Sequence, residues 1–392
     1  MTLRLRPFAV AVAFVGLVSS NLSMAHVSIE PDKPRPIIKG VSMDGSLKVM
    51  AYFVKGYNTN NKNISRARLH KGVLGFNAQV SDWANGRLSL AFEDRKRDFG
   101  ILDGYITIEK PEVSPFFLTV GQMIVPFGSF GTHSHADSVT QVLGETTERI
   151  IQVGYDSKRF SFAAYGFNGA NVGGHRGGKR DNPMDHYGLD LRIKNHSGPV
   201  RYNAGLHYLN DIGETDGIRQ CLRVVDNNGN STAAPTSVCG NGIDITDRDS
   251  GRDEYDSVDG ISGHIHLNAG RFGFEMEYLG ALSAFNSRDL QFNGQGAKPE
   301  GWLIEGSYAF NIGKRKLIWA LGHQGTGEAR SIRDPRTGQP LPESRYYTSW
   351  VFKFDKTTHI SLEFQHDEDY DESDGGTGDD KNQVFLGLGI NF

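Results

Sequence analysis

Strict alternation of apolar and polar residues is the feature of this sequence that most restricts its fold. In the stretch HYGLDLRIKNHSGPVRYNAGLHYL, residues 186–209, apolar or aromatic residues occupy every second position on both sides of the turn NHSG. Successive side chains of a β-strand point to opposite faces. The stretch therefore predicts a hairpin with one apolar and one strongly polar face.

Composition leaves two kinds of β protein open. The chain of 392 residues is 38% hydrophobic, and its net charge of -4 gives no general attraction to nucleic acid. Beyond residue 26 no apolar stretch is long enough for a membrane helix, and helix-period patterns are scarce. The sequence thus predicts an all-β protein, which is either a set of sandwiches or a sheet whose apolar face meets lipid.

The first 25 residues have the pattern of an export signal. Two arginines precede an apolar core over residues 8–18, and the residues SMA at 23–25 form a small-x-small cleavage site. The core is too short to span a bilayer. We expect cleavage after Ala25 and export of the rest, with an uncleaved anchor as the alternative.

The chain has two cysteines, Cys221 and Cys239, within one polar segment. In an exported protein they meet an oxidising compartment, where a disulfide within a loop is the expected state. Metal binding by two isolated cysteines is the weaker alternative.

The carboxyl-terminal segment NQVFLGLGINF carries a period-two apolar face that ends on the terminal Phe392. It resembles the closing-strand signal of bacterial outer-membrane barrels, which their assembly machinery reads; a chance sandwich strand is the alternative. Together with the export signal, it predicts the outer membrane of a Gram-negative bacterium. The expected partners are that membrane with its lipopolysaccharide and the barrel-assembly machinery.

Sixteen segments have strand patterning. They lie near residues 45–57, 66–80, 87–95, 102–110, 116–123, 147–155, 159–167, 186–194, 199–209, 258–268, 271–281, 301–311, 315–324, 345–354, 359–367 and 382–392. A membrane barrel with a wet interior needs such strands, because every backbone group must pair around a closed sheet. The prediction is an antiparallel transmembrane β-barrel over residues 45–392, preceded by a periplasmic tail at residues 26–44.

Two regularities favour the membrane barrel over a soluble sandwich. Aromatic residues recur near both ends of the outward faces, where strands of about nine to eleven residues meet the membrane interfaces. Short turns such as DSK and NHSG alternate with long connections, among them residues 124–146 and 210–257. Outer-membrane barrels have short periplasmic turns and long external loops, so both termini are predicted to be periplasmic.

A barrel of about sixteen strands leaves an aqueous lumen, and the chain has no separate domain to plug it. The prediction is a porin rather than an enzyme, with no cofactor and no metal. The third long connection is less charged than the others, and in general porins this loop narrows the lumen. Its constriction candidates are His133, His135, Asp137, Glu145, Glu148 and Arg149. A solvated external loop is the alternative.

Alternation also predicts which charged and imidazole side chains face the lumen. The wall candidates are Arg87, Arg95, Arg192, Arg201, His207, His264, His266, Glu275 and Glu277. Arg345, Glu305 and Glu363 face inward by the same pattern. Rings of one sign select ions, but here neither sign dominates, so charge selectivity cannot be predicted.

A family resemblance rests on two motifs. GQMIVPFGSF and the following VLGETTERIIQVGYD, together with the signal peptide and the terminal Phe392, resemble the LbtU-type siderophore porins of Legionella. The resemblance implies a plugless outer-membrane barrel that takes up iron-siderophore complexes. The spacing of Gly121, Pro126, Phe127 and Gly128 is also similar to phosphate-selective porins, although the third loop lacks a cluster of basic residues.

Three hypotheses follow. The first is a porin for a ferric siderophore or a similar small polar solute, and the second is a general or anion-preferring diffusion porin. The third is a barrel enzyme that uses Ser262 with His264 and His266, which share one face of a predicted strand.

Overall fold

The structure is a computed structural model. It describes residues 35–38, 40–56, 63–93, 98–169, 184–219, 221–222, 224–225, 231–232, 257–287, 289–334 and 339–392. Two predicted site residues, Arg95 and Cys239, lie outside these ranges, so the inward position of Arg95 and the disulfide stay predictions. Cys221 is described: it is buried, and its thiol donates to the Ser331 carbonyl at 3.3 Å.

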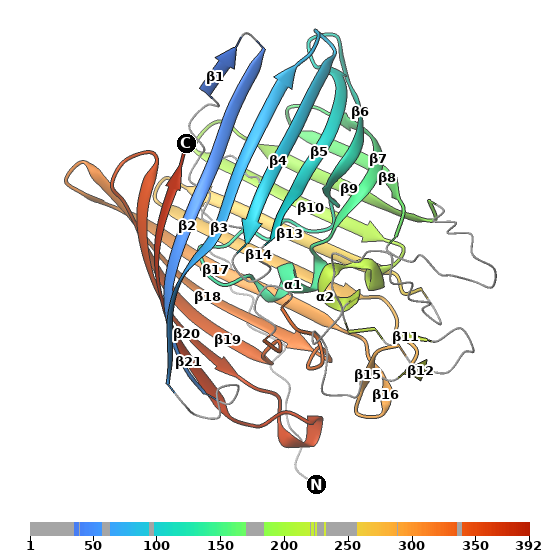
Figure 1. The fold of residues 1–392 in the computed structure, drawn as a ribbon, viewed down its shortest axis with the longest axis vertical. Helices are drawn as coiled ribbons and strands as arrows, with labels where there is room; N and C mark the ends of the chain where they lie inside the picture. The colour runs from blue at the N-terminus through green and yellow to red at the C-terminus, as the bar shows by residue number, and fades with distance from the viewer. Residues whose placement is uncertain are drawn as a thin grey trace.

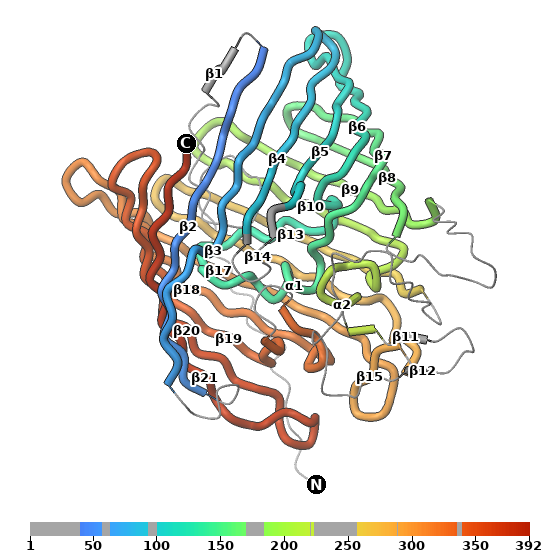
Figure 2. The backbone as a smooth tube through the Cα atoms, viewed as in Figure 1, coloured from blue at the N-terminus to red at the C-terminus, as the bar shows by residue number. Residues whose placement is uncertain are grey.

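Sixteen of the described strands form one closed antiparallel barrel (Figures 1 and 2). They are β2 (Val41–Gly56), β3 (Ile64–Gln79), β4 (Ala84–Glu93), β5 (Asp98–Lys110), β6 (Ser114–Ile124), β7 (Thr147–Asp156), β8 (Phe160–Phe167), β9 (His186–Asn195), β10 (Val200–Leu209), β13 (Gly260–Ala269), β14 (Phe272–Ala281), β17 (Glu300–Ile312), β18 (Arg315–Gly327), β19 (Ser344–Lys353), β20 (Thr358–Glu368) and β21 (Asp380–Asn391). Neighbours in chain order pair with each other, and β2 pairs with both β3 and β21. The predicted strands are confirmed, and their ends agree to within four residues.

The remaining elements are short. They are β1 (Arg35–Ile38), α1 (Val139–Gly144), η2 (Ile212–Glu214), α2 (Asp216–Arg219), β11 (Val224–Val225), β12 (Ser231–Thr232), β15 (Gln291–Phe292), β16 (Gln295–Gly296) and η3 (Glu372–Asp374). Within the described ranges, no helix has the length and apolar character needed to cross a bilayer.

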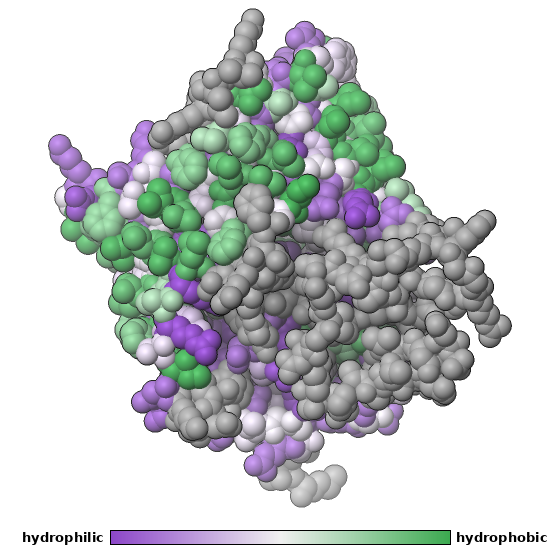
Figure 3. All heavy atoms as spheres, viewed as in Figure 1, coloured by the Kyte–Doolittle hydropathy of each residue, from purple (hydrophilic) through white to green (hydrophobic). Residues whose placement is uncertain are grey.

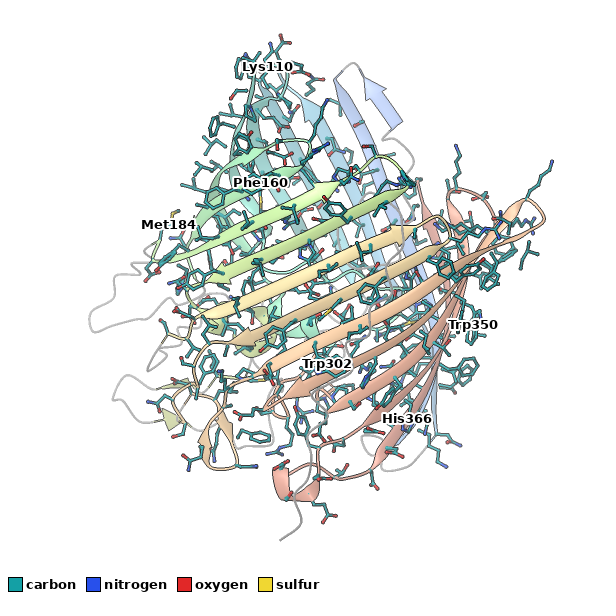
Figure 4. All side chains as sticks on the ribbon, turned by 180° about the vertical axis from the view of Figure 1, so that it is seen from behind. Lys110, Phe160, Met184, Trp302, Trp350 and His366 are labelled. Atoms are coloured by element: carbon teal, nitrogen blue, oxygen red, sulfur yellow. The ribbon has the colours of Figure 1, made fainter. Side chains whose placement is uncertain are left out.

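Alternation places the apolar residues on the outside of the wall. Leu191 on β9, Leu206 on β10 and Leu386 on β21 are large apolar side chains that remain exposed. Figure 3 shows the apolar residues gathered on the outer face over β2–β6, with polar residues at the rim. In Figure 4, Phe160 and Trp350 mark outward faces, and Lys110 marks the end of the barrel with the short turns. The opposite end carries the long connections.

The barrel closes at the carboxyl terminus. The Gly45 amide donates to the Phe392 carbonyl at 2.8 Å, and the Phe392 amide donates to the Gly45 carbonyl at 3.0 Å. A Cβ at position 45 would lie 2.5 Å from the Phe392 ring. Because glycine has no side chain, the terminal ring can lie against the β2 backbone.

The amino-terminal boundary differs from the prediction. Residues 41–44, assigned to the tail, belong to β2, and β1 pairs with its first residues. Val41 and Met43 continue the β2 ladder against β3 beyond the point where β21 ends. β1 occupies the edge left there, and Pro36 is compatible with an edge strand.

An apolar cluster lies within the barrel rather than in its wall. Residues 125–146, which we call the inward loop, contribute Val125, Phe127, Phe130, Val139, Val142 and Leu143. They pack against Ile212 and Ile218 of the connection after β10 and against Leu279 on the inner face of β14. Figure 1 shows α1 and α2 within the outline of the barrel. Burying each large apolar side chain contributes about 1.5–3 kcal/mol, so the third long connection folds into the lumen.

Candidate functional site

The inward loop is fastened to the barrel wall by three carboxylates, of which Glu277 on β14 is the first. It accepts hydrogen bonds from the Ser129 amide at 2.6 Å, the Phe130 amide at 3.1 Å and the Thr140 hydroxyl at 2.8 Å. Hydrogen bonds to an ionised acceptor are roughly twice as strong as neutral ones. The Glu277 carboxylate therefore holds two separate parts of the inward loop, one at Ser129 and Phe130 and one at Thr140.

Glu305 on β17 holds the next part of the loop. It accepts from the His133 amide at 2.8 Å, and its other oxygen lies 2.5 Å from His133 Nδ1. The Thr132 hydroxyl and the Tyr347 hydroxyl also donate to Glu305, at 2.8 and 2.6 Å. The carboxylate is 1% exposed and saturated with donors, so it serves the loop rather than the pore surface.

Glu363 on β20 holds the far side of the loop. It accepts from the His135 amide at 2.6 Å and the Ser134 hydroxyl at 3.1 Å. The Arg345 guanidinium donates to the Asp137 carbonyl at 3.3 Å. The loop thus follows the inner face of the wall from β14 to β20.

A cavity of about 580 Å³ lies between the inward loop and the neighbouring wall strands β19, β21, β2 and β3. Its loop side is formed by His135, Ala136, Asp137 and Val142. Its wall side is formed by Met50, Tyr52 and Val54 of β2, Ile64, Arg66, Ala67, Arg68 and His70 of β3, Arg345 of β19, and Lys381, Gln383 and Phe385 of β21. Asp334, Gln339, Pro340 and Leu341 of the connection after β18 complete the lining.

Basic side chains outnumber acidic ones in the lining of this cavity, which has four Arg or Lys residues and two carboxylates, Asp137 and Asp334. Arg345 and Lys381 are both paired with the buried Asp367, at 2.8 and 2.7 Å. By contrast, no described carboxylate forms an ion pair with Arg66 or Arg68. The Arg68 guanidinium lies 5.4 Å from the centre of the Tyr52 ring, a cation–π arrangement that holds the side chain along the wall.

The loop side of the cavity is uncharged at His135. Burial, with the positive charge of Lys48 next, lowers the pKa of His135 well below its usual range. Its ring stacks on Phe385 at a centroid distance of 6.2 Å, and neither ring nitrogen has a hydrogen-bond partner among the described residues. The imidazole is therefore a neutral part of the cavity lining, and both of its ring nitrogens are buried.

The structure separates the six predicted constriction residues. His135 and Asp137 line the cavity, whereas His133 is bound to Glu305. Glu145 follows α1, and its carboxylate accepts a hydrogen bond from the side-chain amide of Gln141. Glu148 faces inward and pairs with Arg219 at 2.9 Å.

The inward position predicted for Arg149 is wrong. It is exposed and lies on the same face of β7 as the outward residues Ile151 and Val153. β7 begins at Thr147, so strand alternation already applies at position 149 and turns its side chain away from the lumen.

The predicted wall residues that are described face inward, mostly within polar networks. Arg87 pairs with Asp44 at 3.0 Å, and Arg192 pairs with Asp190 at 2.7 Å. Arg201, on β10, alternates with outward Tyr202.

A histidine chain follows the inner face of β10 and β13. His207 Nδ1 lies 2.9 Å from Asp190, and its Nε2 lies 2.9 Å from His264 Nδ1. His266 contacts the Ser129 hydroxyl of the inward loop at 2.9 Å and lies 3.7 Å from Glu275. These three histidines are part of the barrel wall behind the inward loop.

The predicted enzyme arrangement is not assembled in the described part of the chain. Ser262 is fully buried, and its hydroxyl has no hydrogen-bond partner. Nucleophilic catalysis by serine needs a base within hydrogen-bond reach, and His264 is instead bound to His207.

Sequence reasoning missed Arg66 and Arg68, the cavity's distinctive charges. Their i, i+2 spacing places both on one face of a strand, which is the available signal. A β-bulge between Lys48 and Val49 shifts the β2–β3 register. The extra residue is His70 of β3, so alternation counted through it assigns the two ends of β3 to inconsistent faces.

Two groups of described residues have metal-ligand chemistry. In the first, His133, Glu275 and Glu305 present ligand atoms within 4.8 Å of one another, but the His133–Glu305 contact already satisfies both partners. The second consists of His186, Asp211 and Glu214 and lies outside the cavity.

Comparison with known proteins shows distant sequence relatives. No protein-family model matches the chain. A UPF0422 protein of Coxiella burnetii is 25% identical over 357 residues, covering 89% of this chain and 67% of the relative. A UPF0422 protein of Legionella pneumophila is 25% identical over 350 residues, covering 86% of this chain and 61% of the relative. The chain thus spans about two thirds or less of these relatives.

Solved structures with this fold are outer-membrane porins and channels. Pseudomonas putida OprB has a TM-score of 0.57 at 13% identity, covering 90% of this chain and 94% of its own. An anion-selective porin from Comamonas acidovorans has a TM-score of 0.53 at 10% identity, covering 90% and 99%. The channel DcaP of Acinetobacter baumannii has a TM-score of 0.52 at 14% identity, covering 90% and 97%. The fold is that of Gram-negative outer-membrane porins.

Proposed function

We propose that the protein is an outer-membrane channel for small anionic solutes, with the long connections outside the cell and both termini in the periplasm. The observation that carries the proposal is the cavity between the inward loop and the basic inner face of β3. Selectivity in a wide barrel requires protein groups close to the permeating solute. The inward loop supplies one side of that passage, and Arg66 and Arg68 supply the other.

The proposed solute class is an oxygen-rich anion, for which a ferric siderophore complex with carboxylate ligands is the leading case. Arginine recognises carboxylate and phosphate oxygens in a bidentate manner. Tyr52 and Phe385 add aromatic surface to the same cavity, which suits a solute larger than an inorganic ion. The resemblance of the loop motifs to siderophore porins supports the same solute. The alternative is an anion-preferring diffusion porin without a dedicated solute.

Reversal potentials in planar bilayers test the anion preference. The full chain is reconstituted with a KCl gradient across the membrane, and the Arg66→Gln/Arg68→Gln variant is compared with wild type. We expect anion preference in wild type and a shift toward cations in the variant. Arg149→Gln is the outer-face control, because it removes one positive charge outside the lumen, and each single variant, Arg66→Gln and Arg68→Gln, is compared with it. Equal shifts in the single variants and the control, or cation preference in wild type, would contradict the proposal.

A second measurement separates a dedicated siderophore channel from a general anion porin. Ferric citrate and citrate are each added to open channels, and labelled iron uptake is measured in a deletion strain that carries either wild type or the double variant. A dedicated channel gives current block by the ferric complex at concentrations where citrate alone has no effect, and uptake that depends on Arg66 and Arg68. If ferric citrate and citrate block the current equally, the protein is a general anion porin without a dedicated solute.

A further inference from the structure

The second metal-ligand group lies where two long connections leave the barrel. His186 is the first residue of β9, Asp211 directly precedes η2, and Glu214 ends η2. Their exposed fractions are 7%, 1% and 1%. Two carboxylates and an imidazole are therefore buried together, outside the cavity assigned to the solute.

The three side chains converge. One ligand atom from each lies within 4.8 Å of the other two. His186 Nδ1 lies 3.9 Å from Asp211 Oδ2, and His186 Nε2 lies 3.9 Å from Glu214 Oε1. Zinc binds nitrogen and oxygen ligands at about 2.0–2.2 Å, so two ligands on one ion lie about 3–4 Å apart. Small side-chain movements are enough to close this set around an ion.

Two atoms of the group are buried without a hydrogen-bond partner among the described residues: His186 Nδ1 and Asp211 Oδ2. The other Asp211 oxygen accepts from the Gly213 amide at 2.9 Å, which aims Oδ2 at the histidine. The His186 ring stacks on Phe167 at a centroid distance of 5.4 Å. Buried polar atoms are otherwise almost always paired, so this pair of orphaned atoms points to a missing partner.

The charge around the group is also unbalanced. Arg219 is shared by Glu148, Glu214 and Asp216, at 2.9, 3.4 and 2.5 Å. Among the described residues, Asp211 has no basic partner within 4.0 Å except the His186 ring nitrogen. A buried carboxylate in such surroundings is stabilised by a cation.

We propose that His186, Asp211 and Glu214 form a binding site for a divalent transition-metal ion of the zinc type. Imidazole nitrogen with carboxylate oxygen is a ligand set that suits zinc, whereas calcium requires six to eight oxygens. The ion joins the start of β9 to the segment after β10. That segment contacts the base of the inward loop, because the Asp216 amide donates to the Glu145 carbonyl at 3.0 Å. The site is independent of the proposed function.

Equilibrium dialysis of the full chain in detergent, after chelator treatment, tests the site. Zn²⁺ and Ca²⁺ are titrated separately, and bound metal is counted by elemental analysis. The variants are Asp211→Asn and His186→Asn, both close in shape to the native residues. His366→Asn is the matched control, because His366 lies 4.0 Å from both Glu368 and Asp380 but is partly exposed, at 37% of its side chain. Heat-modifiable migration on gels verifies that each variant has formed a barrel.

We expect wild type and His366→Asn to bind one equivalent of Zn²⁺ in preference to Ca²⁺. Loss of a ligand should weaken that binding by more than about tenfold, since even changes to groups behind the ligands cost 10–100-fold. No Zn²⁺ binding by wild type overturns the proposal. So does unchanged binding in folded Asp211→Asn and His186→Asn, which places the metal elsewhere. Equal affinity for Zn²⁺ and Ca²⁺ overturns the assigned class of ion, and this dialysis is independent of channel activity.

Discussion

At the scale of single residues, the inward carboxylates have a role that their sequence pattern does not reveal. Alternation correctly predicts that Glu277, Glu305 and Glu363 face the interior, where they read as pore-lining charges. The structure uses them to bind backbone amides of the inward loop. Their partners are 148, 172 and 228 residues away in the chain. No local pattern encodes contacts of that separation.

Replacing Glu305 with Gln should loosen the inward loop. The change removes the charge that strengthens bonds from Thr132, His133 and Tyr347, and a lost hydrogen bond to a charged group costs about 1.5–3 kcal/mol. We expect noisier and higher single-channel conductance. Glu109→Gln is the control, since among the described residues its carboxylate accepts a hydrogen bond from Asn85 alone, at 3.3 Å. Identical recordings from both variants would show that Glu305 does not hold the loop.

At the scale of elements, the inward loop is the feature that distinguishes this barrel from a wide, open pore, because it lies inside the lumen. Deleting residues 132–143 removes the segment between Gly131 and Gly144. The deletion also removes all of α1 but its last residue, Gly144. It removes the His133 and His135 amides, which are bound by Glu305 and Glu363. We expect higher conductance and weaker discrimination between citrate and chloride, measured in bilayers. If specific uptake is lost while conductance stays the same, the loop acts as a lid for the ligand instead. A deletion that changes neither removes the loop from the mechanism.

The closing strand supports a second prediction at this scale. Phe392→Ser should reduce the heat-modifiable fraction of the protein, because the terminal ring lies against Gly45 at the seam between β2 and β21. Phe272→Ser is the control: it removes an outward aromatic that is 59% exposed and far from the seam. Equal assembly of the two variants would contradict a special role for the terminal residue.

Strands were predictable from sequence, and the site was predictable only in part. Apolar and polar residues alternate along each strand with a period of two. A strand can therefore be recognised from its own residues, without knowledge of its neighbours in the sheet. The position of Arg149 was wrong because it was grouped with the loop, although the predicted strand 147–155 already includes it and alternation places it on the outward face. Arg66 and Arg68 were overlooked because a bulge at His70 interrupts alternation in β3. The inward fold of the loop was expected from resemblance, whereas its anchors depend on tertiary contacts.

At the scale of the whole molecule, net charge and pore charge are separate quantities. The chain carries a net charge of -4, yet the described wall of the cavity is basic. Charges act over a Debye length of about 10 Å in 0.1 M salt and about 3 Å in 1 M salt. A solute in the passage therefore experiences Arg66 and Arg68 far more than the acidic groups of distant loops.

Anion preference should consequently fall as salt concentration rises. We expect the reversal potential, measured at a fixed tenfold KCl gradient, to approach zero when the mean concentration increases from about 0.1 M to about 1 M. A preference that is unchanged over this range would show that selectivity arises from shape rather than from fixed charge.

The anchoring of the inward loop also sets the order of events during biogenesis. Its hydrogen-bond partners on β14, β17 and β20 follow it in the chain by 137 to 229 residues. Contacts of such separation form late, because the intervening chain must be ordered first. The nascent barrel therefore passes through a stage in which the wall is nearly complete and the lumen is still wide, and the passage narrows only when the last third of the protein is in place.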